Sequence, residues 1–170
     1  MKYQLKLILT AILLIVFQSV LDNYLNITIY LSIALLPFII LILPYKMSTI
    51  TTMITAFVIG ILGDILGNGI LGMTAAAMVG ASAFRKILLN SLVNKEILTK
   101  KEYPDIHSLR LTDFTLYSSI FLAIYLLIFI AIDNAGLAPF GLFSLRFIIS
   151  LLANILIYMA LYIITSEREA

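Results

Sequence analysis

Long apolar stretches separated by short polar gaps make up almost the whole of this chain. Six of them approach the length of about 20 mostly apolar residues that a helix needs to cross a lipid bilayer. Their expected bounds are residues 5–21, 28–43, 48–62, 69–89, 113–132 and 142–165. The pattern predicts an all-α integral membrane protein, a compact bundle of about six transmembrane helices in a single domain over residues 1–170.

The second stretch is short and contains a proline. Pro37 lacks a backbone N–H, so we expect a kink in a helix over residues 28–43. Pro44 falls near the end of that helix, where proline is common.

Composition supports a lipid environment. The chain is 62% hydrophobic and 12% charged, and 170 residues cannot bury that much apolar surface in one water-facing domain. The net charge of +2 is too small to indicate a nucleic-acid partner. The absence of cysteine and the single histidine, His107, exclude a thiolate metal site and a site built from several histidines.

The positions of the basic residues predict the orientation. With six alternating helices and the N-terminus in the cytoplasm, ten of the 11 basic residues fall on the cytoplasmic side and only Arg146 falls outside. Both termini are therefore expected to be cytoplasmic, as is the loop at about residues 90–112. Its first part is compatible with an amphipathic stretch along anionic lipid or with a solvated turn.

Glycine and other small residues concentrate between residues 60 and 83. Gly72, Ala76 and Gly80 recur every four residues and predict a narrow strip on one face of the fourth helix. Such a strip lets two helices approach closely, either a partner's helix or another helix of the same bundle.

Asp64 is the charged residue that stands out, because it has apolar neighbours near the outer end of the third helix. Three roles are open. It can cap the start of the fourth helix by accepting N–H bonds near residues 67–69, form an ion pair with Arg146, or carry a proton. No motif for a metal, phosphate or serine-hydrolase site is present, so no catalytic residue is predicted.

The last helix carries a polar stripe with a spacing of four residues. Its members are Ser150, Asn154, Tyr158 and Tyr162. Asn154 lies near mid-span, where an unpaired amide is costly, so it is expected either to bond to a neighbouring helix or to line a substrate cavity.

The glycine-rich region resembles the rod shape-determining protein MreD family of bacterial inner-membrane proteins. The matching residues are Gly60, Asp64, Asn68 and the run Gly72-Met73-Thr74-Ala75-Ala76-Ala77, followed by Arg85. This version of the motif is most similar to members from Bacteroidetes-type bacteria. Pro37-Phe38 upstream and Phe143-Ser144 downstream are similar as well.

The resemblance implies a non-catalytic scaffold of the cell-elongation complex, which makes lateral peptidoglycan and gives the cell its rod shape. It further implies an MreC-like bitopic membrane protein as partner, in an assembly with a RodA-like glycosyltransferase, its transpeptidase and an MreB-like filament. No cofactor is implied. The alternative is a substrate-binding membrane subunit of an energy-coupling-factor-type transporter, which has a similar size and helix number.

Overall fold

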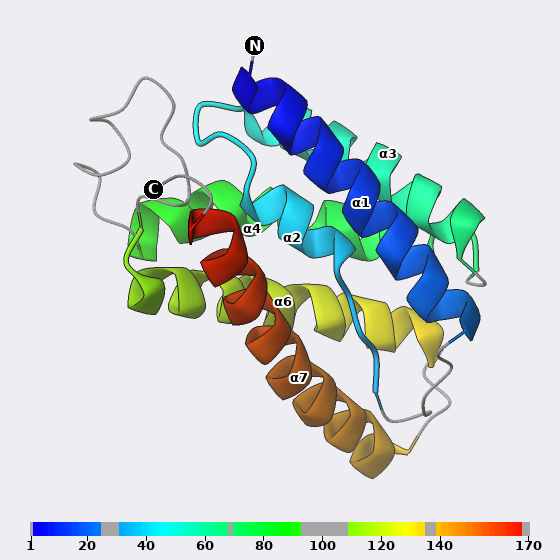
Figure 1. Ribbon diagram of the computed structural model, residues 1–170. Coiled ribbons are helices and arrows are strands. Elements are labelled where there is room, and N and C mark those ends of the chain that lie inside the picture. The colour runs from blue at the N-terminus through cyan, green and yellow to red at the C-terminus, as the bar shows by residue number, and fades with distance from the viewer. Residues whose placement is uncertain (1, 25–30, 68–69, 93–108, 135–138, 168–170) are drawn as a thin grey trace.

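The computed structural model describes residues 2–24, 31–67, 70–92, 109–134 and 139–167, and every regular element within these ranges is an α-helix. Figure 1 shows their arrangement. In chain order the helices are α1 (Lys2–Tyr24), α2 (Leu36–Leu41), α3 (Thr49–Leu66), α4 (Met73–Leu92), α6 (Leu111–Asp133) and α7 (Phe140–Glu167). Helices therefore occur at five of the six predicted stretches, with each end within four residues of its expected position.

The predicted helix over residues 28–43 is wrong. Residues 31–35 are not helical, and only the six residues of α2 form a helix in this part of the chain. Pro37 lies in the first turn of α2, where its missing N–H breaks no intrahelical bond, and the helix begins there instead of bending. The helix ends at Leu41, shortly before Pro44.

The chain nevertheless passes from one end of the bundle to the other in this segment. In Figure 1 the non-helical residues 31–35 start near the ends of α1 and α7 that lie at the lower right, and the chain leaves α2 toward the opposite end. The start of α1 and the end of α7 lie at that same opposite end.

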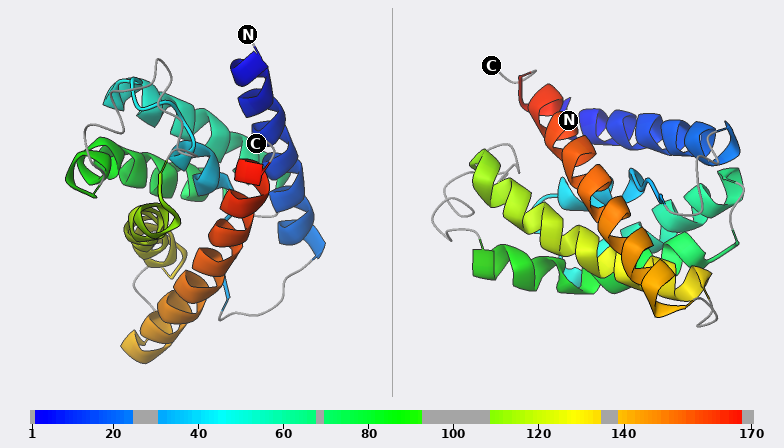
Figure 2. Two further views of the ribbon diagram at one scale, coloured as in Figure 1. Left: turned by 60° about the vertical axis from the view of Figure 1, so that its left-hand side comes forward. Right: turned by 90° about the horizontal axis from the view of Figure 1, so that it is seen from below.

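Helix α2 is the centre of the core. All six of its residues are buried, and Phe38 is fully buried. The Phe38 ring makes edge-to-face contacts with Tyr158 at 5.3 Å and with Phe114 at 6.3 Å between ring centroids. Figure 2 shows α2 between α1 on one side and α4 and α6 on the other.

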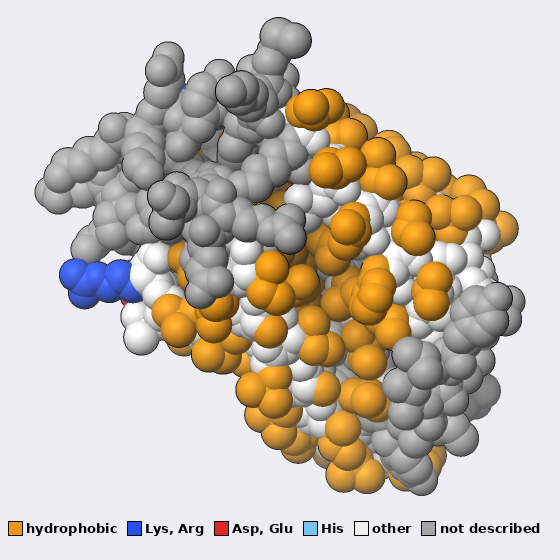
Figure 3. All heavy atoms as spheres, viewed as in Figure 1, with side chains coloured by type: hydrophobic (Ala, Val, Ile, Leu, Met, Phe, Trp, Pro, Cys, Tyr) orange, Lys and Arg blue, Asp and Glu red, His pale blue; other side chains and the backbone are white. Residues whose placement is uncertain are grey.

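The outer surface of the long helices is largely apolar. Large apolar side chains with more than half of their surface exposed include Leu5, Ile50, Ile87 and Leu156, and orange side chains cover much of the visible face in Figure 3. Three helical segments are long and apolar enough to cross a membrane, namely Thr49–Leu66, Leu111–Asp133 and Phe140–Thr165. These features suggest a membrane protein.

Candidate functional site

The polar stripe of α7 contacts the non-helical segment that precedes α2. Ser150, Asn154 and Tyr158 are each completely buried. The Ser150 hydroxyl accepts from the Ser32 N–H at 2.9 Å, and the Tyr158 hydroxyl donates to the Ala34 carbonyl at 2.8 Å. The Asn154 amide accepts from the Ala34 N–H at 2.8 Å and donates to the Ser32 carbonyl at 2.7 Å. The expectation that Asn154 bonds to a neighbour is met, but the neighbour is not a helix.

Gln18 of α1 binds the opposite edge of the same segment. Its amide accepts from the Leu35 N–H at 2.7 Å and donates to the Ile33 carbonyl at 3.1 Å. In a continuous helix the Ile33 carbonyl would accept from the N–H of residue 37, which is a proline. Gln18 therefore supplies the donor that Pro37 cannot. The sequence pattern did not single out Gln18, although it carries the one carboxamide within the apolar stretch of residues 5–21.

Gln18, Ser150, Asn154 and Tyr158 together form what we call the polar clamp. Ser32 and Ala34 bond to α7, whereas Ile33 and Leu35 bond to α1, so alternate residues face opposite sides as in a β-strand. Each carboxamide bridges two residues, as a neighbouring strand would. Non-helical backbone within a bilayer requires such partners, because lipid offers none.

Arg146 binds the start of this segment and the end of α6. Its guanidinium forms an ion pair with Asp133 and donates to the Ser32 hydroxyl at 2.9 and 3.1 Å. The predicted pair between Arg146 and Asp64 is therefore replaced by a pair with Asp133. Asp133 ends α6 and Arg146 lies in the second turn of α7, so the short connection between the helices brings the two charges together.

Asp64 caps α4. Its carboxylate is buried and accepts from the backbone N–H groups of Gly72 at 2.8 Å, Thr74 at 3.2 Å and Ala75 at 3.4 Å. Capping is one of the three roles that the sequence left open, but the donors lie beyond the expected residues 67–69. The carboxylate binds N–H groups that have no partner within the helix. Its negative charge also interacts favourably with the positive end of the helix dipole.

The small residues serve contacts inside the bundle. A Cβ added to Gly60 would lie 2.4 Å from the Ala75 Cα, so α3 and α4 touch backbone to backbone at this point. A Cβ on Gly80 would lie 2.6 Å from the Ile128 Cδ1 of α6. Gly60 and Gly80 thus permit close packing of α4 with both of its neighbours.

The predicted strip of Gly72, Ala76 and Gly80 is not one helical face. Gly72 precedes α4 and has a φ of +91°, which favours glycine, so it belongs to the turn. Ala76 is exposed, whereas Gly80 is partly covered by α6. Of the motif residues, Asn68 lies outside the described part of the chain.

Arg85 is a buried cation, only 3% exposed. It lies on the buried face of α4 and donates to the Leu43 carbonyl, just after α2. It therefore ties the chain after α2 to α4, as the polar clamp ties the chain before α2 to α1 and α7.

The polar side chains of the clamp, Asp64 and Arg85 all bind backbone N–H or carbonyl groups of the protein itself. Within the described ranges, no three His, Asp or Glu side chains lie close enough together to hold a metal ion. Comparisons with protein-family models, with curated proteins and with solved structures give no match.

Proposed function

We propose that this chain is a non-catalytic scaffold of the bacterial inner membrane, belonging to the cell-elongation complex and binding partner membrane proteins through helix contacts. The proposal takes the chain to cross the membrane six times, with the broken segment around α2 as the second crossing and with both termini in the cytoplasm. An MreC-like bitopic protein is the expected direct partner. A RodA-like glycosyltransferase with its transpeptidase and an MreB-like filament would belong to the same assembly.

The observation that carries the proposal is what the motif residues do. Gly60 allows the contact with Ala75, and Asp64 binds the N–H groups of Gly72 and Ala75. Four of the residues that resemble the MreD family thus meet at one junction between α3 and α4, namely Gly60, Asp64, Gly72 and Ala75. A motif that fixes the angle between two helices suits a scaffold, because a scaffold binds its partners with a rigid outer surface.

One observation favours the alternative, a transporter subunit: residues 31–35 before α2 are not helical. Broken crossings in transporters commonly bind substrate with their free backbone groups. Here the protein's own side chains bind the N–H and carbonyl groups of Ser32 and Ala34, the Ile33 carbonyl and the Leu35 N–H. A crossing already bound in this way favours the scaffold.

The test compares Ala76→Leu with Gly60→Leu. Ala76 is exposed on α4, so leucine there blocks a partner without a clash inside the bundle. Gly60 contacts Ala75 directly, so leucine there disrupts the protein itself. We expect Ala76→Leu to keep normal abundance but to lose co-purification of the bitopic partner from native membranes, and Gly60→Leu to lose abundance.

Two results would contradict this assignment. Retention of the partner by Ala76→Leu would exclude this face of α4 as the interface. Co-purification of transporter ATPase subunits in place of elongation proteins would favour the alternative function.

A further inference from the structure

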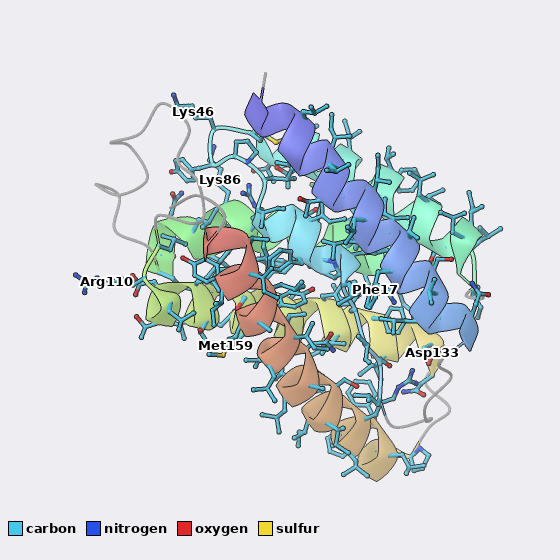
Figure 4. The ribbon with its side chains drawn as sticks, in the orientation of Figure 1. Phe17, Lys46, Lys86, Arg110, Asp133 and Met159 are labelled. Atoms are coloured by element: carbon cyan, nitrogen blue, oxygen red, sulfur yellow. The ribbon has the colours of Figure 1, made fainter. Side chains whose placement is uncertain are left out.

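Positive charge collects at one end of the bundle. Lys46, Lys86 and Arg110 are exposed and lie at the same end in Figure 4, while Asp133 lies at the other. The Arg146 cation at that other end is neutralised by Asp133. We call the end with Lys46 and Lys86 the basic end.

The loop that carries Lys46 is fastened to the end of α4 that carries Lys86. Lys46 follows Tyr45, whose hydroxyl donates to the Asn90 side chain at 2.6 Å, and this bond fastens the loop before α3 to the last turns of α4. Helices α3 and α4 run antiparallel with Gly60 beside Ala75. Because both rise equally per residue, this register brings the first turn of α3 level with Lys86.

Among the described residues, no carboxylate forms an ion pair with Lys46 or Lys86. Asp113 lies in the first turn of α6, close in sequence to Arg110 and not to either lysine. Arg85 is buried beside Lys86 and donates to a backbone carbonyl, and no carboxylate in the described ranges forms an ion pair with it. Its charge therefore adds to the positive potential at Lys46 and Lys86.

Exposed apolar side chains lie close to the lysines in the sequence, one at the start of α3 and one on α4. Ile50 in the first turn of α3 is 71% exposed, and Ile87 next to Lys86 is 60% exposed. Cations at the end of an apolar surface match an anionic phospholipid, whose phosphate lies just above its acyl chains.

We propose that Lys46 and Lys86 bind the phosphate of an anionic phospholipid whose acyl chains lie on Ile50 and Ile87. The inference depends on the membrane location and not on the scaffold role. Loss of partner binding would leave it intact, and loss of lipid binding would leave the partner interface intact.

Native mass spectrometry of the full chain in detergent, titrated with phosphatidylglycerol or phosphatidylcholine, tests the proposal. We expect the chain to prefer phosphatidylglycerol. Lys46→Gln/Lys86→Gln should weaken phosphatidylglycerol binding by about 30-fold, from the attraction expected for two cations near an anionic headgroup. The matched Lys46→Arg/Lys86→Arg variant keeps both charges and should bind within about threefold of the parent chain. Circular dichroism confirms that both variants fold.

Equal binding of the two lipids by the parent chain would overturn the proposal, as would unchanged phosphatidylglycerol binding in the glutamine variant. A third arm uses inorganic phosphate. Binding of free phosphate as tight as that of the lipid would overturn the assignment of Ile50 and Ile87 to the acyl chains, because it would leave them no contribution.

Discussion

Replacing Asn154 with leucine tests the polar clamp directly. Leucine branches at the same carbon as asparagine and has as many side-chain heavy atoms, so the substitution removes hydrogen bonds without opening a cavity. The Ala34 N–H and the Ser32 carbonyl lose the partners that bind them at 2.8 and 2.7 Å. The Asn154 side chain is completely buried, so water does not replace those partners.

The expected loss in the free energy of unfolding is estimated from the typical costs of two kinds of lost hydrogen bond. An unsatisfied buried backbone group costs about 1–3 kcal/mol, which gives about 2–6 kcal/mol for two groups. Hydrogen bonds between membrane helices average only about 0.6 kcal/mol, because the separated helices find other partners. Backbone outside a helix has no internal partner, so the first range applies better. We expect a loss of about 3 kcal/mol in the free energy of unfolding.

The assay is equilibrium unfolding in mixed micelles titrated with SDS and followed by circular dichroism. Asn90→Leu is the matched control, because Asn90 is exposed and bonds only to the Tyr45 hydroxyl among the described residues. Its expected cost is below about 1 kcal/mol. If Asn154→Leu costs no more than Asn90→Leu, the polar clamp does not stabilise the non-helical segment before α2 and the reasoning is refuted.

Two further predictions concern the junction of α3 and α4. Gly60→Ala should destabilise the protein by about 1–3 kcal/mol, because its Cβ would lie 2.4 Å from the Ala75 Cα. Gly141→Ala, where no atom lies within 4 Å, should be neutral or stabilising, and the same SDS titration compares the two; equal effects would contradict the close contact. Asp64→Asn should be tolerated better than Asp64→Leu in abundance and cell-shape assays, because an amide oxygen still accepts the N–H bonds of α4. The reverse order would indicate that the charge, and not the acceptor, is what the site needs.

The helices that a sequence pattern predicts well are long apolar stretches with no internal proline and with one face on the outside of the bundle. The stretches of α6 and α7 are long and apolar, and their ends lie within two residues of the prediction. The segment around Pro37 is equally apolar, but its side chains are buried by protein. Hydropathy does not distinguish these two environments, and it does not reveal that Gln18 and Asn154 replace helical hydrogen bonds.

For the polar residues, the sequence indicates the type of contact but not the partner residue. The position of Asp64 before a new helix indicated a cap, and the structure has one with different donors. The position of Arg146 indicated an acidic partner on the same side, but Asp22, Asp64 and Asp133 all met that condition. The choice depends on how α6 and α7 cross, which the spacing of residues does not determine.

The polar clamp also determines when the segment before α2 can reach its final hydrogen bonding during synthesis. Gln18 emerges from the ribosome before the segment it binds, whereas Ser150, Asn154 and Tyr158 emerge more than a hundred residues after Ser32 and Ala34. Until α7 is made, the backbone donors and acceptors of Ser32 and Ala34 lack the partners that they have in the finished protein. In the proposed membrane location, the nascent chain must therefore hold that segment in the insertion machinery, or leave it outside the bilayer, until its last helix arrives.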